Sequence, residues 1–204
     1  MASARVVHIV DDDDAVRDSL GFLLMAAGYE IKTYESASRF LELFTGEEAG
    51  CLITDVRMPG LTGLELARRL RSLGSNMPIV VMTGHADVPL AVEAMKSGAK
   101  DFIEKPFEAD AILTAVQGAL ARSEQPRSED AQRSAAIMRM ETLSARERDV
   151  LKGLIAGKAN KAMARELGIS PRTVEVYRAA VMTKMQASSL SQLVRMALVA
   201  VQTG

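Results

Sequence analysis

The chain has 204 residues and a formal net charge of −1, and its content of 48% hydrophobic and 25% charged residues excludes a mainly disordered protein. No apolar run reaches the roughly 18 residues of a transmembrane helix, and the apolar run near the N-terminus is too short for a signal peptide. The single cysteine, Cys51, excludes an intramolecular disulfide and a cysteine-based metal site, so we expect a cytoplasmic protein with no membrane partner.

Short apolar runs alternate with helix-period stretches over the first 121 residues. The runs that predict strands are Arg5–Val10, Tyr29–Tyr34, Cys51–Thr54, Ile79–Met82 and Asp101–Ile103. The stretches that follow them predict helices over residues 14–27, 36–45, 63–73, 88–97 and 107–121. Five successive strand-then-helix units indicate an α/β fold, with a five-stranded, parallel, doubly wound sheet covered by helices on both faces.

The composition changes after this α/β region. Residues 122–140 are small, polar and charged, and they predict a linker that is helical in part. Over residues 141–204 the pattern is only helical, with helices predicted at Ser144–Ala156, Asn160–Leu167, Ser170–Met185 and Ser189–Val201. Ser144 and Glu147 have the spacing of a capping box. We therefore expect three parts, an α/β domain over residues 1–121, the linker, and an all-α domain over the remainder.

Charge is distributed unevenly among the three parts. Residues 1–121 hold 11 Lys and Arg against 18 Asp and Glu, a net charge of −7, whereas residues 141–204 hold 10 against 5, a net charge of +5. The linker holds 4 against 3, a net charge of +1. An acidic first domain and a basic last domain indicate two different tasks, and the second task is expected to be binding to a polyanion.

Polar side chains stand directly after four of the predicted strands. They are Asp11 and Asp12, Asp55, Thr83 and Lys105. Ligands of an open parallel sheet bind at the carboxyl ends of its strands, so we expect these side chains to converge. Clustered carboxylates repel one another, and their pKa values rise unless a cation neutralises them. Oxygen ligands of this kind suit Mg²⁺. Each residue also has an ordinary alternative, which is helix capping for an acid, a surface charge for the lysine and a loop hydroxyl for Thr83.

The same residues resemble the receiver domain of two-component response regulators, over essentially all of residues 4–121. The likeness rests on Asp11-Asp12, on Thr54-Asp55-Val56-Arg57-Met58-Pro59-Gly60, on Thr83-Gly84 and on Lys105-Pro106. It implies a flavodoxin-like sheet, a sensor histidine kinase as partner, and Mg²⁺ as the divalent cation needed for phosphorylation. It also implies a cis peptide bond between Lys105 and Pro106.

The resemblance assigns a role to individual residues. The implied roles are phosphoacceptor for Asp55, metal ligands for Asp11, Asp12, Asp55 and the backbone carbonyl of Arg57, and switch or phosphate contacts for Thr83, Phe102 and Lys105. For Phe102 the alternative of simple core packing is compatible with a switch role, because a switch aromatic is a core residue with two allowed positions. Phosphoryl transfer depends mostly on positioning and charge neutralisation, and these residue types supply both.

A second motif lies in the basic region. The short helix Asn160–Leu167, a turn over residues 168–171 and a longer helix that ends at Met185 have the spacing of a helix-turn-helix, whose second helix enters the major groove of DNA. Over about residues 138–202 the chain resembles the LuxR-type DNA-binding domain, with Tyr177 where that family usually has histidine. As a whole the chain resembles the NarL/FixJ family of response regulators, which includes regulators of nitrogen fixation.

The second helix and its neighbours supply the candidate DNA contacts. The expected contacts to the phosphate backbone are Lys161, Arg172, Thr173, Arg178 and Lys184, and the expected base contacts are Glu175, Val176 and Ala179. Phosphate contacts position the protein, and contacts to base edges specify the sequence. The alternative is that these are merely solvated helix positions.

These inferences predict a phosphorylation-activated, DNA-binding transcriptional regulator that is not an enzyme. A sensor histidine kinase would phosphorylate Asp55, and the chain would form a homodimer through its fourth helix and fifth strand, bind promoter DNA and activate transcription with RNA polymerase. One alternative is a Mg²⁺-dependent phosphohydrolase, but haloacid-dehalogenase-type enzymes need a second acid where Arg57 stands. Another is DNA binding without phosphorylation, which the complete acidic pocket disfavours.

Overall fold

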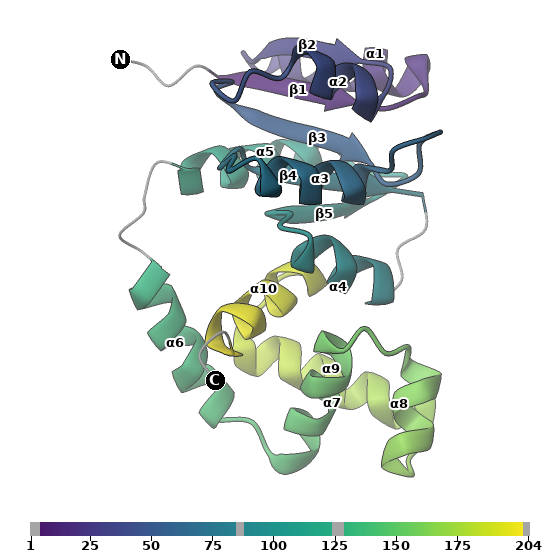
Figure 1. Cartoon of the computed structure of the whole chain (residues 1–204). Coiled ribbons are helices and arrows are strands. Elements are labelled where there is room, and N and C mark those ends of the chain that lie inside the picture. The colour runs from purple at the N-terminus through teal and green to yellow at the C-terminus, as the bar shows by residue number, and fades with distance from the viewer. Residues whose placement is uncertain (1–4, 85–87, 124–128, 202–204) are drawn as a thin grey trace. The chain divides into compact units, whose positions relative to one another are not determined.

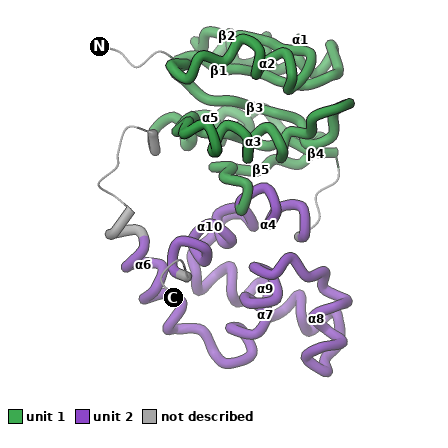
Figure 2. Tube along the Cα trace, in the orientation of Figure 1, with its two compact units in different colours: residues 1–86, 96–125 green, residues 87–95, 126–204 purple. Residues whose placement is uncertain are grey.

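The chain divides into two compact units, which Figure 2 shows in different colours. A computed structural model describes residues 5–84, 88–123 and 129–201. The first unit comprises residues 1–86 and 96–125, and the second comprises residues 87–95 and 126–204. Among the helices of the described residues, none combines the length and the apolar character needed to cross a membrane.

The first unit contains a five-stranded parallel sheet, which confirms the predicted α/β fold (Figure 1). Its strands are β1 (Val6–Val10), β2 (Glu30–Tyr34), β3 (Cys51–Asp55), β4 (Ile79–Thr83) and β5 (Asp101–Glu104). They are ordered β2-β1-β3-β4-β5, and every neighbouring pair is parallel. Every residue of β1, β3 and β4 is buried, as central strands covered on both faces require.

Helices cover both faces of this sheet. The helices that follow the strands are α1 (Asp14–Ala26), α2 (Ala37–Leu43), α3 (Gly63–Ser72), α4 (Val88–Lys96) and α5 (Ala109–Ser123). A single hydrophobic core joins Ile9 of β1 to Leu24 of α1 and Ile112 of α5. Side chains alternate along a strand, so the buried His8 faces the other way, where its ring contacts Phe40 of α2. Helices α1 and α5 therefore cover one face, and α2 covers the opposite face.

The second unit is helical. Its C-terminal helices are α6 (Glu129–Glu141), α7 (Ala145–Ile155), α8 (Asn160–Leu167), α9 (Pro171–Met185) and α10 (Leu190–Val201). Helices α7 and α8 both pack against α9, which confirms the predicted helices after residue 141. From residue 129 the predicted linker 122–140 forms most of the regular helix α6, which packs against α10 and α9 and buries Ala136. Linker residues 124–128 lie outside the described residues, and residues 87–95, most of α4, are grouped with this unit.

Side chains fix where several of the described helices begin. The capping residues are Asp13 for α1, Ser36 for α2, Thr62 for α3, Ser144 for α7 and Ser170 for α9. Each has an extended backbone, and its side-chain oxygen accepts a backbone N–H of the first turn, which satisfies a donor that the helix itself cannot pair. The predicted capping box of Ser144 and Glu147 is present, and a second one joins Thr62 to Glu65.

Candidate functional site

Four adjacent strands, β1, β3, β4 and β5, end at the same edge of the sheet (Figure 1), and the predicted polar residues stand at these strand ends. Asp11 directly follows β1, Asp55 ends β3, Thr83 ends β4 and Lys105 follows β5. The strands are paired so that Asp55 stands beside Met82, one residue before Thr83. The order and register of the strands thus bring residues from four separate parts of the chain to the same edge.

Lys105 joins the two buried acids at this edge. Its ammonium donates to Asp11 Oδ2 at 2.8 Å and to Asp55 Oδ1 at 2.7 Å. Asp11 is 1% exposed and Asp55 is 7% exposed, so both carboxylates have little solvent to stabilise their charge. Burial by itself lowers the pKa of the Lys105 ammonium, but the hydrogen bonds to Asp11 and Asp55 outweigh burial and raise it. The chain therefore supplies its own cation between two acids that would otherwise repel each other.

The loop after β1 is held through Asp11. The backbone N–H of Asp11 donates to the Tyr34 carbonyl at 3.3 Å, and its Oδ1 accepts the Asp13 N–H at 3.0 Å. Its carbonyl oxygen accepts a hydrogen bond from the Arg17 guanidinium at 2.6 Å. Asp12 follows directly, and its side chain is exposed at the sheet edge. The structure thus fixes Asp11 inside the loop and leaves Asp12 on the surface.

The end of β3 is held through its backbone. Asp55 Oδ2 accepts the backbone N–H of Arg57 at 2.5 Å, and the Val56 N–H donates to the Met82 carbonyl at 2.8 Å. Gly63, the first residue of α3, lies directly against this strand end. A Cβ at that position would stand 2.0 Å from the Asp55 carbonyl oxygen and 2.8 Å from Thr54 Oγ1. Only a residue without a side chain lets α3 start so close to Asp55.

Thr83 and Phe102 occupy the predicted strand positions. Thr83 is fully buried, and its carbonyl accepts the backbone N–H of Lys105 at 2.7 Å, which ties the end of β4 to the residue after β5. Phe102 lies on β5 opposite Val81 and is partly buried. The peptide bond between Lys105 and Pro106 is cis. Thr83 and Phe102 thus lie on β4 and β5, the two strands on one side of β3, which ends at Asp55.

The oxygen donors at this edge are of the type that a hard divalent cation binds. Asp11 and Asp55 offer carboxylate oxygens close enough to share one ammonium, and Asp12 follows Asp11 with an exposed side chain. Mg²⁺ takes one or two carboxylates and keeps several waters, so a partly open edge suits it. Within the described parts of the chain, no three Asp, Glu, His or Cys side chains are grouped in a way that could hold a metal ion. In this arrangement the Lys105 ammonium stands between the two buried acids.

The predicted helix-turn-helix is present in the second unit. Helix α8 ends at Leu167 and is capped by Gly168, whose φ of 65° is the left-handed conformation that favours glycine. Ser170 then caps α9 by accepting the Thr173 N–H at 3.0 Å, and Pro171 occupies the first helical position. The turn between α8 and α9 therefore has the residues that each of its backbone conformations requires.

The candidate DNA contacts differ in exposure and in their protein partners. The exposed ones are Lys161, Arg172, Glu175, Val176, Ala179 and Lys184, and the partly buried ones are Thr173 and Arg178. The apolar residue Val176 is 63% exposed. The Arg178 guanidinium donates to Asn160 Oδ1 at 3.4 Å, so it is oriented from α8.

Lys184 is also paired within the protein. Its ammonium donates to Glu147 Oε2 at 2.7 Å, and that carboxylate also accepts the Ser144 N–H at 2.7 Å. The hydrogen bond from Lys184, followed by that from the Ser144 backbone, holds the pKa of the buried Glu147 carboxyl below its usual value. This pair joins the start of α7 to the last turn of α9.

Two of these contacts were not predictable from the sequence pattern. Arg17 acts on a backbone carbonyl six positions earlier, and periodicity carries no signal for a backbone acceptor. Glu147 and Lys184 are 37 positions apart, and the capping-box spacing accounts for Glu147 without any cation. In both cases the missing information is how the elements pack in space.

Comparison with known protein families gives two matches. The family described as response regulator receiver domain matches residues 7–117, and the family described as bacterial regulatory proteins, luxR family, matches residues 141–197. The first match contains the sheet edge with Asp55, and the second contains the helix-turn-helix.

Relatives match nearly the whole chain. The transcriptional regulatory protein FixJ of Azorhizobium caulinodans is 58% identical over 98% of this chain and 95% of that protein. FixJ of Bradyrhizobium diazoefficiens is 53% identical over 97% of both chains, and the response regulator protein TodT of Pseudomonas putida is 44% identical over 94% of this chain and 85% of its own. A crystal structure of full-length FixJ from B. japonicum shares 51% identity and a TM-score of 0.58, covering 98% of each chain.

Proposed function

The chain belongs to the response regulators that join a receiver domain to a luxR-type DNA-binding domain, and from that premise we propose that phosphorylation of Asp55 controls its binding to promoter DNA. It is a transcriptional regulator, and the receiver implies a sensor kinase as its partner. The observation that carries the proposal is the bridge from the Lys105 ammonium to the carboxylates of Asp11 and Asp55 at the sheet edge. That edge collects the nucleophile, the acids and the cation that phosphoryl transfer requires.

In the proposed reaction, an oxygen of the Asp55 carboxylate forms a bond to phosphorus while the bond from phosphorus to the donor breaks. The electron pair of the breaking bond leaves with the donor, which is a phosphohistidine of the sensor kinase or a small acyl phosphate. Carboxylates are weak nucleophiles, so the site must position the phosphoryl group and neutralise its charge. The Lys105 ammonium is the cation nearest to Asp55, and we assign it to a phosphoryl oxygen once the bond has formed.

Mg²⁺, when bound by Asp11, Asp12, Asp55 and the carbonyl of Arg57, would neutralise negative charge on the transferring oxygens. Asp55 itself is already oriented by the Arg57 N–H, which holds Oδ2 and leaves Oδ1 towards Lys105. The Thr83 hydroxyl would donate to the phosphoryl oxygens, and Phe102 would move as the end of β4 shifts. A change of this kind requires two discrete packings of the same residues.

We assign DNA binding to the second unit. Lys161, Arg172, Thr173, Arg178 and Lys184 would contact phosphates, and Glu175, Val176 and Ala179 would face the bases. We further propose a receiver over residues 1–121, a linker over 122–140 and a DNA-binding domain over 141–204. A homodimer of the phosphorylated chain would occupy two half-sites and recruit RNA polymerase. The FixJ relatives at 50–58% identity support nitrogen-fixation promoters as the targets.

A hydrolase function is the weaker candidate. Phosphohydrolases of the haloacid-dehalogenase type use a second acid two positions after the nucleophile, and this chain has Arg57 there. The backbone N–H of Arg57 binds Asp55, while its side chain is exposed. A stable phosphoaspartate that acts as a signal is therefore the better proposal, and the family is one of transcription regulators.

The test combines labelling with DNA binding. Full-length protein is incubated with acetyl phosphate and Mg²⁺, and intact-protein mass spectrometry measures the added phosphoryl group. DNA sequences selected by the phosphorylated wild type are then used in a mobility-shift assay. Wild type should gain one phosphoryl group and bind DNA more tightly, and a chelator should abolish both effects. Asp55→Asn should stay unlabelled and bind weakly, whereas Asp110→Asn, the same change at an exposed acid of α5, should behave as wild type.

Two results would contradict the proposal. One is stoichiometric labelling of Asp55→Asn, because it would place the phosphoryl group elsewhere. The other is labelling of wild type that leaves DNA affinity unchanged, because it would separate the receiver from the DNA-binding unit.

A further inference from the structure

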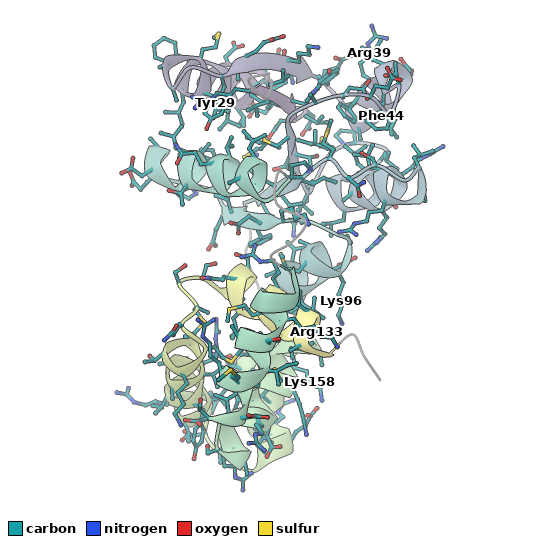
Figure 3. All side chains as sticks on the ribbon, turned by 90° about the vertical axis from the view of Figure 1, so that its left-hand side faces the viewer. Tyr29, Arg39, Phe44, Lys96, Arg133 and Lys158 are labelled. Atoms are coloured by element: carbon teal, nitrogen blue, oxygen red, sulfur yellow. The ribbon has the colours of Figure 1, made fainter. Side chains whose placement is uncertain are left out.

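Arg17 is a mostly buried cation at the edge of the acidic site. It lies in the first turns of α1, and its side chain is only 14% exposed. Its guanidinium donates to the Asp11 carbonyl at 2.6 Å and also pairs with the carboxylate of Asp14. Arg39 and Glu42 of α2 form an ion pair of the same spacing, but their side chains are 48% and 63% exposed (Figure 3 labels Arg39). The burial of Arg17 therefore reflects its second partner, the Asp11 carbonyl.

That carbonyl belongs to the peptide that joins Asp11 to Asp12. The other polar groups of Asp11 are already engaged, since its N–H, Oδ1 and Oδ2 are bound by Tyr34, Asp13 and Lys105. The Arg17 bond fixes the remaining group and with it the plane of the peptide. The direction in which the backbone enters Asp12 follows from that plane, because each peptide unit is rigid.

The negative charge of the neighbouring aspartates also favours an arginine at position 17. Residues 11–14 are four consecutive aspartates, and the Arg17 guanidinium contacts two of them. A guanidinium presents several donors in a fixed planar fork, so it can hold a carbonyl and a carboxylate at the same time. A lysine ammonium or a neutral side chain would not hold both in the same orientation.

We propose that Arg17 is a positioning residue for divalent-cation binding, because it holds the Asp11–Asp12 peptide in the orientation that presents Asp12 to the metal. This inference rests on the proposed function, which makes Asp11 and Asp12 metal ligands. In this proposal Arg17 is not itself a ligand and acts through the backbone of its neighbours. Groups that orient metal ligands from outside typically change metal affinity by about 10–100-fold when they are removed.

The experiment measures Mg²⁺ binding directly on the full-length chain. MgCl₂ alone, at constant ionic strength, is titrated while the amide NMR signals of residues 11–15 are followed. Arg17→Met and Arg17→Gln both remove the guanidinium, and Arg39→Met removes the exposed ion pair of the same spacing as a matched control. We expect about tenfold weaker Mg²⁺ binding in both Arg17 variants and unchanged binding in Arg39→Met. Two Arg17 variants are used so that Mg²⁺ affinity can still be measured if one of them fails to fold.

The outcomes separate this inference from the proposed function. Unchanged Mg²⁺ affinity in a folded Arg17 variant would overturn the inference and limit Arg17 to stabilising α1, even if thermal stability falls. Labelling of wild type by acetyl phosphate is measured in parallel. Wild type that binds Mg²⁺ through these residues but gains no phosphoryl group would overturn the proposed function and leave the role of Arg17 intact. Wild type that binds no Mg²⁺ would overturn the inference.

Discussion

The position of Asp55 depends on a neighbour that has no side chain. Gly63 starts α3 directly against the backbone of Asp55, where a Cβ would lie 2.0 Å from the carbonyl oxygen. A backbone carbonyl in a central strand cannot move away as the tip of a flexible side chain can. The geometry of the Asp55 carboxylate therefore depends on how closely the helix approaches the strand end.

Gly63→Ala should destabilise the chain and reduce labelling of Asp55, because the added methyl group must push α3 away from β3. Overpacking of this kind costs about 1–3 kcal/mol. Urea unfolding measures the loss, and acetyl phosphate labelling measures the effect on Asp55. Gly21→Ala is the matched control, since a Cβ on that helical glycine meets only Ile31 Cγ2 at 3.8 Å. Equal stability changes in the two variants would show that the close approach is not the cause.

At the residue scale the sequence predicts which polar side chains meet at the sheet edge and misses those that orient them. Asp11, Asp55 and Lys105 stand at the carboxyl ends of strands, and these ends meet at one edge of a parallel sheet. Arg17 binds a carbonyl, and Gly63 matters through the space it leaves empty, so neither has a distinctive side-chain pattern. Such roles follow only from the distances between elements.

At the scale of elements, an ion pair joins two helices of the DNA-binding unit. Glu147 closes the capping box of α7 and at the same time pairs with Lys184 in the last turn of α9. The Glu147 side chain is 8% exposed, while that of Lys184 is 40% exposed. A buried carboxylate that lost its cation would keep an uncompensated charge, so the pair stabilises the packing of α7 against α9.

Acid should weaken this unit through Glu147. Its pKa is lowered in the folded chain, so its contribution to the free energy of unfolding is present above its ordinary value of 4.5 and is lost as the pH falls through the folded pKa. Glu147→Gln should therefore be less stable than wild type at neutral pH, and the difference should shrink in acid. Denaturant unfolding across pH values measures it.

The exposed pair Lys158–Glu166 supplies the control (Figure 3 labels Lys158). Its side chains are 38% and 54% exposed, and surface pairs of this kind contribute about 0–1 kcal/mol. Glu166→Gln should thus change stability less than Glu147→Gln. A difference between Glu147→Gln and wild type that stays constant from neutral to acid pH would contradict the role of the charge.

Most elements are predictable from periodicity, but the packing of α6 against other helices is not. Residues 160–167 form the predicted helix without change, and the other predicted elements differ from the structure only by a few residues at their ends. The linker composition over residues 122–140 is polar and carries few apolar residues, which favours an exposed segment. Helix α6 nevertheless buries Ala136, because packing against α10 supplies the stability that its composition lacks.

At the scale of the whole molecule, α6 belongs with the C-terminal helices. It packs against both α10 and α9, so we expect a fragment of this unit to be more stable when it includes α6. Residue 138, where the resemblance to DNA-binding domains begins, lies inside α6 and after Ala136. A fragment that starts there loses the buried part of the helix.

Fragment 126–204 should be more stable than fragment 138–204, because only the longer one retains all of α6. For domains of this size, each kcal/mol of stability changes Tm by about 4–8 °C, and we expect a difference of at least about 5 °C. Thermal unfolding followed by far-UV circular dichroism measures Tm of both fragments. Equal Tm values would mean that α6 contributes nothing to the unit it packs on.

The two-part organisation is the feature that the sequence reveals most directly. Regular alternation of strands and helices predicts the parallel sheet, and the change to helices alone, together with the change from −7 to +5 in charge, predicts a second task. Both family matches agree with that division of tasks. Composition does not predict that most of α4 is grouped with the C-terminal helices.

In the unphosphorylated chain, Lys105 already bridges the two buried acids of the sheet edge. The two buried acids are compensated by a charge that the chain carries covalently, so their charge balance needs no bound ion. If phosphorylation uses Mg²⁺, as we propose, we expect removal of the cation to stop labelling of Asp55 without unfolding the chain. Return of the cation should restore labelling, because the chain does not have to refold.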